Sequence, residues 1–137
     1  ILPVGGARLG QRGVQAAHRA SEAAQAARRA AKATSEIVVT AKTYRSVFYK
    51  HFPKAPAEYI IHHRIPQQWR FLVGADVVDR LGNLRAVAPG AHRNDLNAAW
   101  RHFAEAMGRR GREPTPAEVK AYARYVDKLF GQHFWRP

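Results

Sequence analysis

The sequence predicts an α+β domain that is mostly helical. Residues 14–33 are dominated by strong helix formers, and residues 95–107 and 116–130 carry apolar side chains at helical spacing. Two short segments between these helices, 57–61 and 84–87, are predicted to be strands. A chain of 137 residues with 46% hydrophobic residues can bury one core of ordinary size. We therefore expect one compact domain in which two short strands pack among helices.

The first 43 residues are expected to precede this domain. Residues 1–13 carry Pro3 and several glycines and predict a flexible lead-in, while residues 14–33 predict an alanine-rich linker helix. The alternative for this basic helix is that it lies on nucleic acid or on a partner protein. Residues 34–40 fit either a short strand or a continuation of the helix. Because the chain begins with Ile1 rather than Met, we expect it to be a fragment or processed product of a larger protein.

Aromatic residues mark the start of the expected domain. Tyr44, Phe48 and Phe52 recur every four residues and would form one stripe on a helix. We interpret the stripe as core packing, with stacking on nucleic-acid bases as the alternative. Residues 67–72 then predict a short helix or turn with Trp69 and Leu72 facing inward.

Two longer helices follow the second strand. In the last one, Thr115 and Glu118 have the spacing of a capping box, and Pro116 suits the first helical position. The apolar stripe of the earlier helix is expected at Leu96, Trp100, Phe103 and Met107. The buried stripe of the last helix is expected at Val119, Tyr122, Val126, Leu129 and Phe130.

The charge of the chain limits its partners. It has 23 Lys and Arg against 10 Asp and Glu, a formal net charge of +13. Such a field attracts polyanions, which include nucleic acid, an anionic membrane and an acidic protein. No apolar run approaches the ~20 residues that span a bilayer, and the alanine-rich helix lacks large apolar anchors, so we expect no stable membrane insertion. The lack of cysteine excludes disulfides, zinc–thiolate sites and thiol catalysis.

Two adjacent histidines stand where the first strand must end. His62 and His63 follow an apolar run and precede Pro66, and His92 lies at the start of a predicted helix. Neighbouring side chains in a strand point to opposite faces, but this alternation can relax at the end of the strand. One imidazole could then bind a metal while the other takes a proton from water near neutral pH. The other four histidines, His18, His51, His102 and His133, are interpreted as surface residues or as core residues with satisfied hydrogen bonds.

The carboxylates are poorly placed for a two-metal site. The chain has four aspartates, and none adjoins the histidine pair. One divalent ion held by His62 and His92, and completed by water, phosphate and either Asp95 or Asn97, is the better interpretation.

These residues resemble a known family. The run His62-His63-Arg64-Ile65-Pro66, then Asn83-Leu84, then His92 and residues 97–103 are similar to the HNH, or His-Me finger (ββα-metal), nucleases. The nearest resemblance is to nuclease domains at the C-terminal ends of bacterial polymorphic toxins. It covers Tyr59 to Phe103. It implies a ββα-metal core with added N-terminal and C-terminal helices, and an HNH-like nuclease toxin domain over residues 44–137.

The resemblance also implies roles for individual residues. His62 and His92 would be metal ligands, and His63 would be the general base that activates water. Asn83 would pin the loop between the strands and so orient His63. Many relatives carry a further histidine where this chain has Leu96, which leaves the neighbouring Asp95 and Asn97 as candidates for the third ligand and leaves Mg, Mn, Ni and Zn as candidate ions. The candidate phosphate-binding residues are Arg64, Arg70, Arg85, Arg93 and Arg101, and a solvated surface charge is the alternative for each.

The expected function is therefore that of a metal-dependent endonuclease. We expect a nonspecific DNase that acts as an antibacterial toxin domain, is secreted or delivered from a bacterial cell as part of a larger protein, and acts in the target-cell cytoplasm. An acidic immunity protein is the partner that the charge and the resemblance predict. The alternatives are a ribonuclease toxin on the same scaffold and a noncatalytic basic module that binds nucleic acid.

Overall fold

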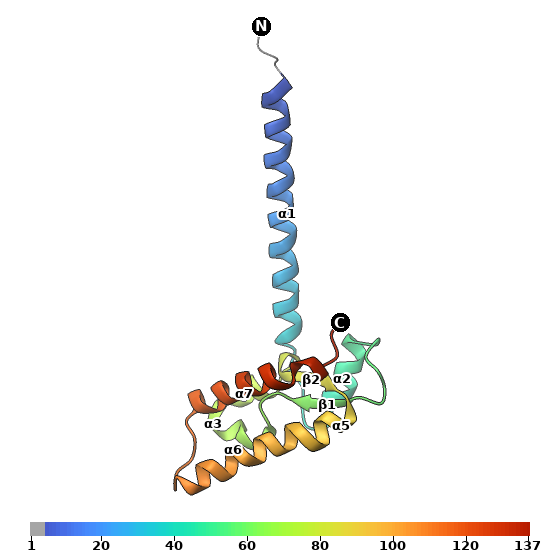
Figure 1. Cartoon of the computed structure of the whole chain (residues 1–137). Helices are drawn as coiled ribbons and strands as arrows, with labels where there is room; N and C mark the ends of the chain where they lie inside the picture. Colours follow the sequence, from blue (N-terminus) through green and yellow to red (C-terminus); the bar gives the residue numbers. More distant parts are fainter. Residues whose placement is uncertain (1–4) are drawn as a thin grey trace. The chain divides into compact units, whose positions relative to one another are not determined.

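The computed structural model describes residues 5–137, apart from the side chains of residues 5–9 and of Arg93. The chain divides into two compact units, residues 1–35 and residues 36–137. The first unit holds one long helix, α1 (Gly5–Ser35), and the second is the folded domain (Figure 1).

The helix α1 begins earlier than the sequence predicts. The flexible lead-in expected over residues 1–13 is wrong from Gly5 onward, and residues 1–4 lie outside the described residues. The reason is that each glycine costs a helix only about 1 kcal/mol, while the alanine-rich segment that follows supplies a nucleus from which the helix extends. The side chains of residues 10–33 are all exposed. Within the described part of the chain, no helix combines the length and the apolar character needed to cross a membrane.

The folded domain begins at Glu36 rather than at Tyr44. Val39 is buried, and its backbone N–H donates to the carbonyl of Asp79 at 3.1 Å. Val38 forms an antiparallel bridge with Arg80, and the N–H of Leu81 donates to the carbonyl of Ile37 at 2.8 Å. These contacts join residues 36–43 to the domain, so the expected boundary at residue 43 moves back to Ser35.

A two-stranded antiparallel sheet lies in the domain. Strand β1 (Ile60–His63) pairs with β2 (Leu84–Val87), with Ile60 opposite Val87 and His63 opposite Leu84. The predicted fold class, α+β and mostly helical, is confirmed at this level. The far edge of β2 is covered by the C-terminal segment, where Phe134 bridges Val87 and the N–H of Trp135 donates to the carbonyl of Ala86 at 2.8 Å.

Helices of very different length surround the sheet. The longer ones are α2 (Tyr44–His51), α6 (Asn97–Arg109) and α7 (Pro116–Phe130). The short ones are η1 (Gln67–Trp69), α3 (Arg70–Val73), α4 (Ala75–Val78), η2 (Leu81–Asn83), α5 (Pro89–Ala91), the π-helical turn η3 (His92–Leu96) and η4 (Gly131–His133). The helices α6 and α7 pack together (Figure 1), where the hydroxyl of Tyr122 donates to the carbonyl of Ala99 at 2.6 Å.

The last helix starts as predicted but buries a different stripe. The capping box is present, with the N–H of Glu118 donating to the hydroxyl of Thr115 and the N–H of Thr115 donating to the carboxylate of Glu118. The prediction that Leu129 lies in the buried stripe is wrong, because this residue is 46% exposed. Ala123 is buried instead, beside Val126, because a small side chain fits where the helix lies close to its neighbours.

Two apolar clusters hold the sheet between them. One cluster includes Leu96 and Trp100 and packs α6 and α7 around Val87. The other includes Phe48 and packs α2 against Ile61. Tyr44 and Phe52 pack against this second cluster, so the interpretation of the aromatic stripe as core packing is confirmed. The sheet, and with it the histidine pair, is thus fixed from both sides.

Candidate functional site

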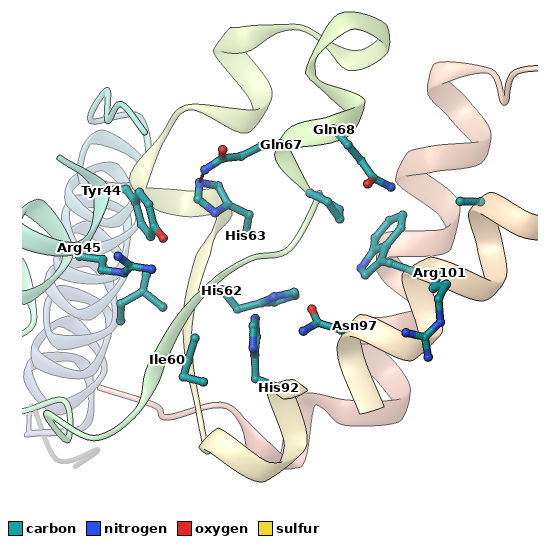
Figure 2. Close-up of a pocket in the computed structure, with 14 residues that line it drawn as sticks. Tyr44, Arg45, Ile60, His62, His63, Gln67, Gln68, His92, Asn97 and Arg101 are labelled. Atoms are coloured by element: carbon teal, nitrogen blue, oxygen red, sulfur yellow. Dashed lines mark hydrogen bonds between the residues drawn. The ribbon is translucent and has the colours of Figure 1, made fainter. Parts of the chain in front are cut away.

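The histidines predicted from separate segments line one cavity. It has a volume of about 530 Å³, and His62, His63 and His92 all contribute to its wall (Figure 2). All four residues of β1 line it, although successive strand residues face opposite sides. Because β1 is paired with β2 on one edge only, side chains from both faces of β1 can reach one cavity past its other edge. Both histidines therefore reach the cavity without the loss of strand alternation that the sequence suggested.

His62 is the most buried ionisable residue of the cavity wall. The residue is 6% exposed. The centroid of its ring lies 5.0 Å from that of His92, and the two ring planes meet at 73°. Burial, reinforced by the neighbouring His92, lowers the pKa of His62 to about 3. Burial also lowers the pKa of His92. Both rings are therefore neutral at pH 7, and the Nε2 atom of His62 has no hydrogen-bond partner among the described residues.

His63 faces a different set of neighbours. The ring of Tyr44 packs edge-on against it at 4.6 Å between centroids. The Nε2 atoms of Gln67 and His63 lie 3.2 Å apart, at hydrogen-bond distance. Burial lowers the pKa of His63, and the carboxylate of Asp79 partly opposes this effect. The ring is thus neutral at pH 7 and held on two sides.

Asn83 ties the loop after β1 to the start of β2. Its side-chain oxygen accepts from the N–H of Ile65 at 3.0 Å, and its amide nitrogen donates to the carbonyls of Ile65 and Val78, both at 3.1 Å. Its own carbonyl accepts from the N–H of Arg64 at 2.7 Å. Asn83 is buried and lies outside the cavity wall, so it can act on His63 only through the backbone.

The π-helical turn decides which residues follow His92 on the cavity side. The N–H of Asn97 donates to the carbonyl of His92, which is an i→i+5 bond. The face of His92 therefore continues at Asn97, which lines the cavity, while Leu96 is fully buried in the core. Asp95 is exposed and does not line the cavity, so the structure does not bring this candidate ligand to the histidines.

Around His92 the cavity wall thus offers two imidazoles, those of His62 and His92, and the side-chain amide of Asn97. Among the described side chains, no group of three or more His, Asp, Glu or Cys residues is arranged to hold a metal ion. Neutral imidazoles are nevertheless the form that binds divalent metals, and amide oxygens are acceptable further ligands. His62, His92 and Asn97 are therefore the residues that could contact an ion here.

The five arginines predicted to contact phosphate fall into different environments. Arg64 pairs with Asp127, and Arg70 pairs with Asp79. The guanidinium of Arg85 donates to two backbone carbonyls, those of Gly82 at 2.9 Å and Leu84 at 2.7 Å. Arg101 is exposed and lines the cavity. The side chain of Arg93 lies outside the described residues.

Several residues of the cavity wall were not predicted as site residues. Arg45 and Tyr44 reach it from α2, and Gln67 and Gln68 reach it from η1. Trp100, predicted as a core residue, is buried and also lines the cavity. No local sequence pattern marks these residues, because α2 is brought to the histidines only by tertiary packing.

The electrostatics of the cavity suit an anionic ligand. Its wall combines two exposed arginines, Arg45 and Arg101, with imidazoles that are neutral and can accept a proton or bind a cation.

Comparison of the chain with protein-family models, with curated proteins and with solved structures finds no significant match.

Proposed function

We propose that the protein is a metal-dependent endonuclease of the HNH, or ββα-metal, type that hydrolyses phosphodiester bonds of nucleic acid, with DNA as the expected substrate. The observation that carries the proposal is the meeting of His62, His63 and His92 in one cavity on an antiparallel hairpin and the helical segment that follows it. The formal net charge of +13 supports a polyanionic substrate.

A divalent ion fits the residues present on one side of β1. His62 and His92 would hold it, because the Nε2 atom of His62 is buried, neutral and unpartnered among the described residues. Asn97 would supply the third contact, because the π-helical turn places it on the cavity side. When bound, the ion would act as a Lewis acid that stabilises charge on the phosphate oxygens.

His63 would act as the general base. In the proposed hydrolysis, the oxygen of a water molecule bonds to phosphorus, its proton passes to His63, and the bridging oxygen leaves with a proton from solvent. A neutral imidazole is required to take that proton, and burial keeps His63 neutral at pH 7. Tyr44 and Gln67 would hold the ring in place, and Asn83 would fix the backbone that carries it.

The biological setting follows from the resemblance and the charge. The protein would act as an antibacterial toxin domain delivered as part of a larger protein, and an acidic immunity protein would cover its basic surface in the producing cell. This partner is proposed on charge complementarity.

Plasmid nicking tests the proposal directly. Purified protein and the His63→Ala variant would be incubated with supercoiled plasmid, first with EDTA and then with Mg²⁺, Mn²⁺, Ni²⁺ or Zn²⁺ added back. We expect cutting by the unmodified protein only when an ion is present, and a loss of at least ~100-fold in His63→Ala. His102→Ala is the matched control, because His102 is exposed on α6 and lies outside the cavity wall.

The same reactions with total RNA separate the substrates. Cutting of RNA but not plasmid would reassign the protein as a ribonuclease. If neither nucleic acid were cut with any ion, the nuclease proposal would be abandoned in favour of a noncatalytic binding module.

A further inference from the structure

Arg45 lies outside the segment that carries the family resemblance, yet it is part of the cavity wall. Arg45 belongs to α2, is exposed, and lines the same cavity as His62, His63 and His92. Its guanidinium carbon lies 5.0 Å from the centroid of the Tyr44 ring, and the same ring packs against His63. Tyr44 therefore connects the arginine to the proposed base, and this stacking fixes where the guanidinium can reach.

The availability of this guanidinium distinguishes it from those of three partly buried arginines. The guanidinium groups of Arg64, Arg70 and Arg85 already donate to carboxylates or carbonyls. Among the described side chains, no ion pair involves Arg45 or Arg101. A guanidinium that lines a cavity without a carboxylate partner retains its donors for an anion, and phosphate oxygens match its fork of N–H groups.

The positions of the two exposed arginines suggest a path for the substrate. Figure 2 shows Arg45 and Arg101 on opposite sides of His62 and His92. Both residues line the same cavity, whose volume of about 530 Å³ is in the range that holds a ligand of several hundred daltons. A nucleic-acid strand that places one phosphate at the histidines would therefore bring neighbouring phosphates toward each arginine.

We infer that Arg45 binds a backbone phosphate next to the scissile one, so that the substrate strand crosses the cavity between Arg45 and Arg101. The inference rests on the proposed function and extends it, because it assigns part of the substrate site to α2. Phosphate binding by Arg45 is independent of base sequence, and it orients the strand relative to His63.

Binding measured without cutting tests the inference. A fluorescein-labelled single-stranded oligonucleotide would be titrated with protein in EDTA, and anisotropy would be followed at several NaCl concentrations. We expect Arg45→Ala to weaken binding by about tenfold, and to reduce the slope of log K against log salt by about one phosphate contact. Arg45→Lys should retain most of the slope but recover only part of the affinity, because an ammonium lacks the planar fork of donors.

Lys50→Ala is the matched control. Lys50 is exposed on the same helix, carries the same charge and does not line the cavity. It should change the affinity by less than about twofold and leave the salt slope nearly unchanged. Equal effects of Arg45→Ala and Lys50→Ala would overturn the inference, since the charge of α2 would then act without a specific site. Lack of any binding by the unmodified protein would overturn it as well.

Cleavage assays separate this inference from the proposed function. If Arg45→Ala selectively weakens binding but the unmodified protein cuts nothing, the phosphate site stands and the nuclease assignment fails. If the unmodified protein cuts with metal but Arg45→Ala matches Lys50→Ala in binding and in KM, the nuclease stands and the role of Arg45 is refuted. Circular dichroism and thermal unfolding of each variant show that the fold is retained.

Discussion

Replacing Asn97 by histidine should create a metal site with three imidazoles, whereas replacing Leu96 should not. In an ordinary α-helix the residue four positions after His92 would share its face. The i→i+5 bond from Asn97 to His92 shifts this face by one residue, so Asn97 lines the cavity and Leu96 is 0% exposed in the core. The two substitutions therefore test the register of one turn.

The two substitutions should change the stability of the protein in opposite directions when metal is present. Asn97 is exposed, so Asn97→His should leave the metal-free fold almost unchanged. If the third imidazole tightens Zn²⁺ or Ni²⁺ binding about tenfold, saturating metal adds about 1.4 kcal/mol of stability. For a domain of about 100 residues this corresponds to a rise in Tm of about 5–10 °C. Leu96→His instead removes a buried leucine and buries an imidazole, at a cost of about 3–5 kcal/mol.

The assay is thermal unfolding with and without metal, supported by calorimetric titration with Zn²⁺ and Ni²⁺. We expect a larger metal-induced rise in Tm for Asn97→His than for the unmodified protein, and a lower Tm without metal for Leu96→His. A Leu96→His variant that binds metal more tightly, beside an Asn97→His variant that does not, would refute the π-helical register as the determinant of the site.

Further predictions concern pH, the loop and the domain boundary. The unfolded chain binds a proton at His62 below pH ~6.5, whereas the folded chain does so only near pH 3. The free energy of unfolding should therefore decrease as the pH is lowered from ~6.5 towards 3, and the loss from His62 should be about 2 kcal/mol at pH 5. Urea unfolding of metal-free protein measures this loss. The His62→Asn variant should lack the part of the pH dependence of stability that comes from this one proton. Asn83→Ala should lower the free energy of unfolding by about 2–4 kcal/mol, because it leaves backbone groups of Ile65 and Val78 without their hydrogen-bond partner. Asn94→Ala, in an exposed position, is the control and should lower it by less than ~0.5 kcal/mol. A chain starting at residue 36 should melt at the temperature of the full chain, whereas one starting at residue 44 should melt well below it, and equal melting of both would contradict the boundary.

Local signals in the sequence predict the two strands and the longer helices of the domain, but not all of their bounds. The capping box of Thr115 and Glu118 is a pattern of neighbouring residues, and the structure has the start of α7 where this pattern places it. The first strand is predicted over residues 57–61 and lies at Ile60–His63, and Pro66, which restricts the backbone before it, follows its end. These features depend on residues close in the chain, so sequence alone identifies them.

Features that depend on tertiary packing were not predictable in this way. The pairing of Arg64 with Asp127 joins segments far apart in the chain, and no pattern shows that this guanidinium has an internal partner. The approach of Arg45 to the histidines depends on how α2 packs against the sheet. The π-helical turn that favours Asn97 over Asp95 has no signature in the sequence, because apolar spacing alone fits an ordinary helix there.

The pairing of the C-terminal segment with β2 has a consequence for the order of folding. Strands β1 and β2 are synthesised well before Phe134 and Trp135, which cover the outer edge of β2. Until those residues are available, the backbone of Ala86 lacks its later partner and the edge of the sheet stays open. A nascent chain therefore carries all three cavity histidines for some time before it can complete the structure that holds them.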